Sequence, residues 1–220
     1  MKLFLLLVVI LDLQAKTCEE LDNDSLWVWP KTHQLVQTSP SKKFYILQSS
    51  YSKKFHQFNR LGIFPHAIYN KNIFIVMRLY ELPPINSLIS NYLMIKKSWE
   101  LNQVKVKGLQ LDFDSTTSNL KAYSTYLKKL KKNLDTDEQV SITGLADWVN
   151  GDKNFQKELK KLDITLFYQF YQGKKFHKNM KQYLRKANDT LNNYYLGFLN
   201  NQIVPNDLIV KNKNFKGFIC

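Results

Sequence analysis

The stretch Gly108-Leu109-Gln110-Leu111-Asp112-Phe113-Asp114 alternates apolar and polar side chains with a period of two residues. In a β-strand this period places the apolar residues on one face and Gln110, Asp112 and Asp114 on the other. Buried carboxylates are costly unless they are paired, so two of them on one strand face indicate a site. A strand that ends in carboxylates and runs into the polar loop 115–118 is typical of the catalytic end of an α/β barrel.

Apolar, β-branched runs alternate with helical patterns on both sides of this strand, which is typical of βα units around a parallel sheet. The sequence predicts eight strands: Ser25–Trp29, Lys43–Ser49, Asn72–Tyr80, Val106–Asp114, Gln139–Leu145, Asp163–Phe170, Tyr194–Phe198 and Lys213–Cys220. It predicts helices after Pro83-Pro84 and over residues 120–134, 155–162 and 177–187.

These elements indicate an α/β fold, a small (β/α)8 TIM-type barrel with reduced or missing helices in the first and last units. Its length is near the lower limit of about 200 residues for this fold. The structural alternative is a flavodoxin-like open sheet. None of the seven glycines falls in a dinucleotide or Walker pattern, which argues against a nucleotide-binding version of that sheet.

The first 15 residues have the features of a secretory signal peptide. Lys2 is followed by an unbroken apolar run from Leu3 to Leu11, and Ala15 is a small residue suited to cleavage. We therefore expect residues 16–220 to form a single barrel domain that is secreted or periplasmic, with no transmembrane segment. Lipoprotein anchoring at Cys18 is the lesser alternative.

The net charge of +14 suggests a polyanionic partner, and an anionic cell-envelope polymer or membrane surface is one hypothesis. Only Arg60, Arg78 and Arg185 are arginines, so we expect no nucleic-acid partner. The lysine-rich helix at residues 121–132 is interpreted as a solvated face.

We expect no cofactor, and the number and spacing of the cysteines and histidines indicate no metal site. The two cysteines, Cys18 and Cys220, lie near the ends of the mature chain, and the sequence leaves their pairing open. The four histidines are far apart and lack metal-ligand spacing.

Because parallel strands carry a barrel's chemistry at their carboxyl ends, those ends supply the candidate site. Asp112 and Asp114 are the candidate catalytic residues. We expect both to face the barrel lumen, at the same end as Trp29, Glu81, Trp148 and Tyr168, and Leu109, Leu111 and Phe113 to pack outward against the helices. The candidate substrate-binding residues combine amide, aromatic and charged groups suited to a sugar ring: Gln110, Tyr168, Trp29, Trp148, Arg78 and Glu81. The strand ends also carry Gln48, Tyr80, Thr143, Asp147, Gln169 and Tyr171.

Residues 107–114 resemble the signature strand of family 18 glycoside hydrolases, the chitinase class, which reads Asp-Gly-x-Asp-x-Asp-x-Glu. Gly108 and Asp112 match it, whereas Gln110 replaces an Asp and Asp114 replaces the acid Glu. Residues 166–169 resemble that family's Met-x-Tyr-Asp stretch, with only Tyr168 kept.

A second resemblance combines this strand with Val140-Ser-Ile-Thr-Gly-Leu-Ala-Asp-Trp148. Both segments are similar to an uncharacterised bacterial secreted family catalogued as domain of unknown function 3142. That resemblance covers roughly residues 25–200 and implies a barrel related to glycosidases.

Together these features predict a secreted, glycoside-hydrolase-like barrel that hydrolyses or binds a polysaccharide or oligosaccharide. Asp114 would donate the proton. Asp112 would raise the pKa of Asp114 or position an acetamido group, which Tyr168 would steady. The alternative is a non-catalytic carbohydrate- or envelope-polymer-binding barrel, so the sequence leaves enzymatic activity open.

Overall fold

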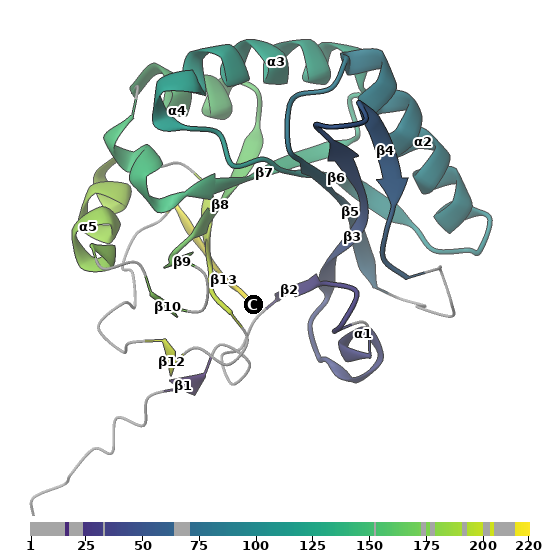
Figure 1. Ribbon diagram of the computed structural model, residues 1–220. Coiled ribbons are helices and arrows are strands. Elements are labelled where there is room, and N and C mark those ends of the chain that lie inside the picture. Colours follow the sequence, from purple (N-terminus) through teal and green to yellow (C-terminus); the bar gives the residue numbers. More distant parts are fainter. Residues whose placement is uncertain are drawn as a thin grey trace, which may run out of the picture.

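The computed structural model describes residues 16–17, 24–32, 34–63, 71–151, 153–172, 175–176, 179–190, 193–199, 203–204 and 214–220. Eight parallel strands form a closed barrel with helices outside it (Figure 1). The barrel strands are β2 (Ser25–Val28), β3 (Lys43–Ser52), β5 (Asn72–Leu79), β6 (Val106–Asp112), β7 (Gln139–Leu145), β8 (Ile164–Gln169), β11 (Tyr194–Gly197) and β13 (Phe215–Ile219).

The barrel closes where the first strand pairs with both the second and the last. β2 pairs with β3 over four residues and meets β13 at Ser25 and Ile219. The backbone N–H of Trp27 also donates a hydrogen bond of 2.7 Å to the carbonyl of Cys220. This closure confirms the predicted (β/α)8 barrel and excludes the open flavodoxin-like sheet.

The helices are concentrated on the middle units. The longer ones are α2 (Ile85–Glu100), α3 (Leu120–Asn133), α4 (Lys153–Lys161) and α5 (Met180–Thr190). The first unit has only α1 (Leu35–Thr38), and two short 3-10 helices, η2 (Thr117–Asn119) and η3 (Ala146–Asn150), follow β6 and β7. Of the described residues between β11 and β13, none is helical. The expectation of thin first and last units is therefore confirmed.

Alternation along the strands creates two separate cores. The larger core lies between the barrel and its helices, and includes Leu109 and Leu111 of β6 together with Tyr123 and Leu127 of α3. The smaller core fills the barrel with side chains from several strands: Trp27, Tyr45, Leu47, Phe74, Val76, Phe167, Tyr195 and Ile219. The lumen below the rim is thus packed, as expected for a barrel of this size.

Gly197 makes room for the largest of the luminal side chains. A Cβ at this position would lie 2.4 Å from the Trp27 ring. Trp27 is 2 % exposed and has no alternative space in the lumen. We expect Gly197→Ala to lower the free energy of unfolding by about 1–3 kcal/mol through overpacking. Urea unfolding of Gly197→Ala and wild type measures this loss. Equal stability of Gly197→Ala and wild type would contradict this packing.

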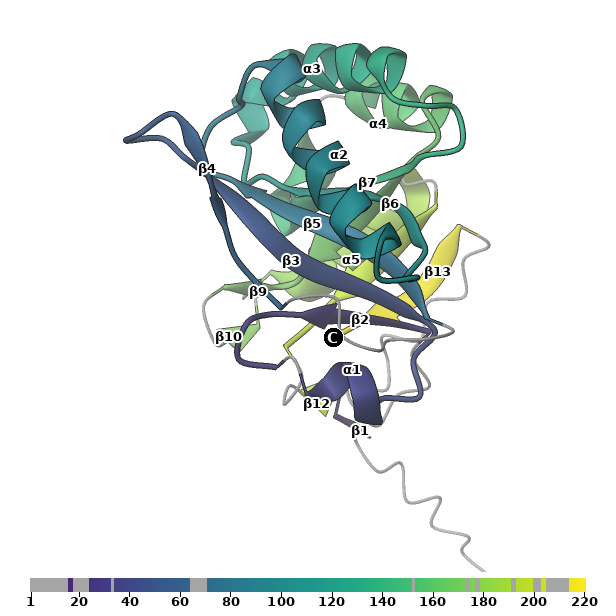
Figure 2. The same ribbon diagram turned by 90° about the vertical axis from the view of Figure 1, so that its right-hand side faces the viewer.

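Strand β3 is longer than its sequence pattern predicted. It continues to Ser52 and turns back into β4 (Gln57–Arg60), an antiparallel strand that pairs with its far half. The resulting hairpin projects beyond the neighbouring strands (Figure 2). Two further short pairings lie outside the barrel: β1 (Lys16–Thr17) with β12 (Ile203–Val204), and β9 (Tyr171–Gln172) with β10 (Lys175–Phe176).

Several sequence predictions concern residues outside the described ones. The signal peptide at residues 1–15 and Cys18 both lie there. Cys220, in the described part of the chain, is disulfide-bonded. Within the described part of the chain, no helix is both long enough and apolar enough to cross a membrane.

Candidate functional site

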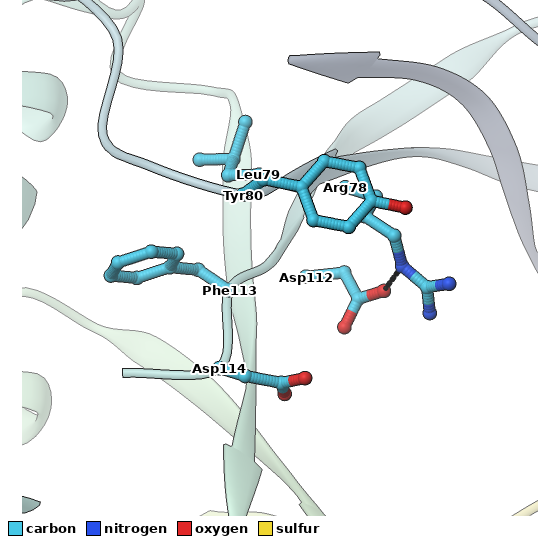
Figure 3. Close-up of a pocket in the computed structure, with 6 residues that line it drawn as sticks. All are labelled: Arg78, Leu79, Tyr80, Asp112, Phe113 and Asp114. Atoms are coloured by element: carbon cyan, nitrogen blue, oxygen red, sulfur yellow. Dashed lines mark hydrogen bonds and ion pairs between the residues drawn. The ribbon is translucent and has the colours of Figure 1, made fainter. Parts of the chain in front are cut away.

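A cleft of about 240 Å³ opens at the carboxyl ends of β5 and β6. Six residues at or just after the ends of these two strands line it: Arg78, Leu79, Tyr80, Asp112, Phe113 and Asp114 (Figure 3). The volume is below the range of about 300–1,000 Å³ typical of drug-sized ligand pockets. A cleft of this size suits one small group.

Strand direction and alternation explain why these residues meet. β5 and β6 are parallel neighbours, and their register places Arg78 beside Asp112. Both strands end at the same rim, so their last polar side chains point to one space. Figure 3 shows the carboxylates of Asp112 and Asp114 on the same side as the Arg78 guanidinium, with Phe113 pointing away. The predicted inward direction of Asp112 and Asp114 is confirmed.

Asp112 is held by two neighbouring strands. Arg78 Nε donates to its Oδ2 at 2.7 Å, and the Thr143 hydroxyl of β7 donates to its Oδ1 at 2.9 Å. The Asp112 side chain is only 3 % exposed, so both oxygens are occupied in a nearly water-free position. Asp112 is therefore fixed in place by one charge-assisted hydrogen bond and one neutral hydrogen bond.

Arg78 is fixed from a second side by an aromatic ring. Its guanidinium carbon lies 5.1 Å from the centre of the Trp29 ring, within the range of a cation–π contact. Burial lowers the pKa of Arg78, but the charge and hydrogen bond of Asp112 outweigh burial and raise it. Arg78 is therefore a permanent cation at the cleft, and Trp29 orients it rather than lining the cleft itself.

Asp114 differs from Asp112 in its surroundings. Its side chain is exposed to the cleft, and no hydrogen bond or ion pair to it is found among the described residues. Desolvation raises the pKa of Asp114, the nearby charge of Asp112 raises it further, and Arg78 partly opposes this shift. Asp114 thus keeps its proton to a higher pH than an ordinary aspartate, as a proton donor requires.

The electrostatic influence of Asp112 on Asp114 is directly measurable. We expect Asp112→Asn to lower the pKa of Asp114, because it removes a negative neighbour and leaves the positive charge of Arg78 uncompensated. Carbon-detected NMR titration of the Asp114 carboxyl group measures the change. Asp147→Asn is the matched control, since Asp147 accepts its hydrogen bond from Thr117 and does not influence Asp114. An unchanged Asp114 titration in Asp112→Asn would refute this coupling.

Gln110 lies one step below the cleft and supports its floor. Its amide oxygen accepts a hydrogen bond of 2.7 Å from the Trp27 indole, and its amide nitrogen donates one of 3.3 Å to Ser141. Gln110 is fully buried, so it braces the luminal core and does not line the cleft. It faces the lumen, as predicted, but the structure gives it a supporting position.

Two predicted substrate-binding residues lie on the outer side of the barrel wall, away from the lumen. Tyr168 is fully buried in the outer core, where Gln156 of α4 donates to its hydroxyl at 3.1 Å. Trp148 is 1 % exposed, packs edge-on against Phe155 and donates to the Ser115 carbonyl at 2.8 Å. The expectation that both line the luminal rim is wrong, because each belongs to the outer core.

Glu81 lies at the rim but is engaged elsewhere. Its carboxylate is 2.5 Å from His56 Nδ1, at the turn of the β3–β4 hairpin. Glu81 is not among the residues that line the cleft. It therefore connects the hairpin to the segment after β5 rather than extending the carboxylate pair.

Three strand-end residues that were not candidate site residues have closer contact with the cleft or its carboxylates than Glu81, Trp148 and Tyr168. Tyr80 is 62 % exposed and forms part of the cleft wall. Thr143 fixes Asp112. Tyr171 follows β8 on the luminal side, and the charges of Asp112 and Asp114 contribute to a raised pKa of its phenol that burial mainly causes. A signal for Tyr171 was available, since it shares its strand face with Phe167 and Gln169.

Among the described residues, no group of three or more histidine, cysteine, aspartate or glutamate side chains is arranged to hold a metal ion. The ionisable side chains that line the cleft are two carboxylates, one arginine and one exposed tyrosine.

The closed barrel and the carboxylates at its strand ends define a class: a small α/β barrel with a carboxylate-lined cleft at the carboxyl ends of its strands. Residues 73–170 match the family model described as Domain of unknown function (DUF3142). The matched segment runs from β5 to the end of β8 and includes every residue that lines the cleft. No curated protein matches the chain.

Proposed function

We propose that the protein is a secreted glycoside-hydrolase-like barrel that cleaves a polysaccharide or oligosaccharide at the Arg78–Asp112–Asp114 cleft. The observation that carries this proposal is the division of labour between two adjacent carboxylates. Asp112 is buried and fully paired, whereas Asp114 is exposed with a raised pKa. Glycosidic cleavage usually requires two carboxyl groups whose different environments suit them to different roles.

Each residue has a defined part in the reaction. Asp114 donates its proton to the glycosidic oxygen as the bond between that oxygen and the sugar carbon breaks. The attacking water then returns a proton to Asp114 as its oxygen bonds to the sugar carbon. The negative charge of Asp112 adds to the desolvation that raises the pKa of Asp114, and it favours the positive charge that develops on the sugar. Tyr80 supplies an exposed aromatic face for the C–H surface of a sugar.

A second function is favoured by a specific feature of the same cleft. Both oxygens of Asp112 are already occupied, by Arg78 and Thr143, so Asp114 is the one carboxylate of the pair that is free to contact a ligand. A single free carboxylate with an aromatic neighbour can bind sugar hydroxyls without cleaving a bond. The alternative proposal is therefore a non-catalytic carbohydrate-binding barrel.

One experiment separates the two functions. The purified chain is incubated with a panel of chitin-type and cell-wall oligosaccharides, and both new reducing ends and retention of the intact sugar are measured. New reducing ends support the hydrolase. Retention without new reducing ends supports the binder. If the panel shows no cleavage and no retention, both proposals are contradicted.

A further inference from the structure

Helices α3 and α4 carry an unusual concentration of positive charge. α3 has five lysines and no acidic residue, and α4 has four lysines and one acidic residue, Glu158. The two helices pack side by side on the outside of the barrel (Figures 1 and 2). Their lysines therefore combine into one basic surface.

Most of this charge is not neutralised. Glu158 pairs with Lys128 at 2.8 Å and Lys161 at 3.1 Å, and these two lysines lower its pKa. Six other exposed lysines on these helices have no acidic partner among the described residues: Lys121, Lys129, Lys132, Lys153, Lys157 and Lys160. We call these six residues the α3–α4 lysine face.

Helical spacing aligns these lysines toward solvent. On α4, Lys153, Lys157 and Lys160 are separated by four and three residues, so they lie along one side of the helix. Phe155 and Leu159 are buried on its opposite side. On α3, the buried residues Tyr123, Leu127 and Leu130 likewise leave the lysines outside. The amphipathic pattern fixes the direction in which the charge points.

The kind of partner follows from two properties of this surface. The exposed large apolar residues in the described part of the chain lie on other elements, namely Phe55, Tyr80, Leu93, Met94 and Leu101. A helix that inserts into a lipid interface needs exposed apolar side chains beside its lysines, and α3 and α4 have none of these. The layer of helices also curves around the outside of the barrel, so its outer surface is convex (Figure 1). A flexible chain can follow such a surface more fully than a flat membrane can.

We propose that the α3–α4 lysine face binds a flexible linear polyanion with closely spaced negative charges. Lysine ammonium groups are compact point charges, so this binding depends on the charge density of the polyanion rather than on a particular sequence or sugar. None of the six lysines lines the cleft. The binding is therefore independent of the chemistry of Asp112 and Asp114, and it would hold the protein on an anionic polymer while the cleft stays open.

The test uses long-chain inorganic polyphosphate and three forms of the full chain. The first is wild type, and the second changes all six lysines of the α3–α4 lysine face to glutamine. The third is a charge-matched control in which six exposed lysines on other elements become glutamine: Lys31, Lys42, Lys53, Lys97, Lys105 and Lys216. Circular dichroism and thermal unfolding establish that all three forms are equally folded, as expected for exposed positions.

The lysine-face variant should raise the Kd for polyphosphate at least about tenfold at moderate salt, and the matched control less than about threefold. The dependence of log Kd on log salt should become shallower in the lysine-face variant, because fewer counterions are released on binding. Equal weakening by both variants would show that net charge alone drives binding and would overturn the proposal. Binding to phosphatidylglycerol vesicles but not to polyphosphate would overturn it in favour of a membrane surface.

Discussion

Replacing Asp114 with asparagine is expected to lower kcat for glycan hydrolysis by about 100- to 10,000-fold, the usual contribution of a positioned acid. Asparagine has nearly the shape of aspartate but has no acidic proton to give to the departing oxygen. Asp114 is exposed and unpaired among the described residues, so the fold should remain intact. The release of reducing ends from any glycan that wild type cleaves measures the loss.

The pH profile distinguishes a lost proton donor from a lost contact. Because the folded pKa of Asp114 is raised, its proton is retained above the range of an ordinary aspartate, and wild-type activity should fall as pH rises through that raised value. The residual activity of Asp114→Asn should lack this alkaline decline. Asp147→Asn, at a nearby aspartate bonded to Thr117, should keep wild-type activity and profile. Cleavage that survives Asp114→Asn with an unchanged profile would show that Asp114 is not the proton donor.

Replacing Arg78 with methionine is expected to lower the free energy of unfolding by about 3–5 kcal/mol, the typical cost of leaving a buried charge without its partner. Asp112 is 3 % exposed and depends on Arg78 for its charge-assisted hydrogen bond of 2.7 Å. The variant also removes the cation–π contact with Trp29. Urea unfolding monitored by circular dichroism gives the loss.

Two further variants isolate the ion pair from loss of side-chain packing. The double variant Arg78→Met/Asp112→Leu removes both charges and should recover much of the lost stability. Arg185→Met, at an exposed arginine on α5, should leave stability within about 0.5 kcal/mol of wild type. If Arg78→Met were as stable as Arg185→Met, Asp112 would not be the buried, charge-paired residue described above.

Much of the barrel follows from local pattern. The alternation in residues 108–114 correctly predicts that Leu109 and Leu111 pack outward and that Asp112 points inward. β7 has the predicted bounds, Gln139–Leu145, and the other barrel strands differ at one end or both. This success has a physical reason: in a closed barrel each strand has two chemically different faces, and a slip of one residue would bury charge under a helix.

The position of Tyr168 shows where resemblance fails. In β8, Ile164, Leu166 and Tyr168 share one face and Thr165, Phe167 and Gln169 share the other, so alternation groups Tyr168 with the apolar residues. The resemblance to a Tyr-containing motif selected Tyr168. The ladder instead pairs Thr143 with Phe167 and Gly144 with Tyr168, which puts Tyr168 outside with the helices. Register against β7 thus agrees with the alternation within β8, and the resemblance to a short motif was the misleading signal.

The hairpin was missed for a different reason. The second half of β3 and all of β4 consist largely of serine and glutamine with one asparagine and one arginine, and they contain none of the β-branched residues that predict strands. Pairing with each other, and the packing of Phe58 against Tyr51, hold these segments as strands. The pairing of Glu81 with His56 depends on this hairpin, so it too was beyond prediction.

The central claim is that the cleft at the ends of β5 and β6 receives a sugar, and the most direct test maps its contacts in solution. Backbone amide shifts of isotope-labelled protein are followed by NMR while the chitin-type and cell-wall oligosaccharides are titrated in. The account predicts saturable shifts concentrated at Arg78, Tyr80 and residues 112–114, and their weakening in Asp114→Asn. Saturable shifts on another face of the barrel with none at these residues, or no shifts with any sugar of the panel, would contradict it.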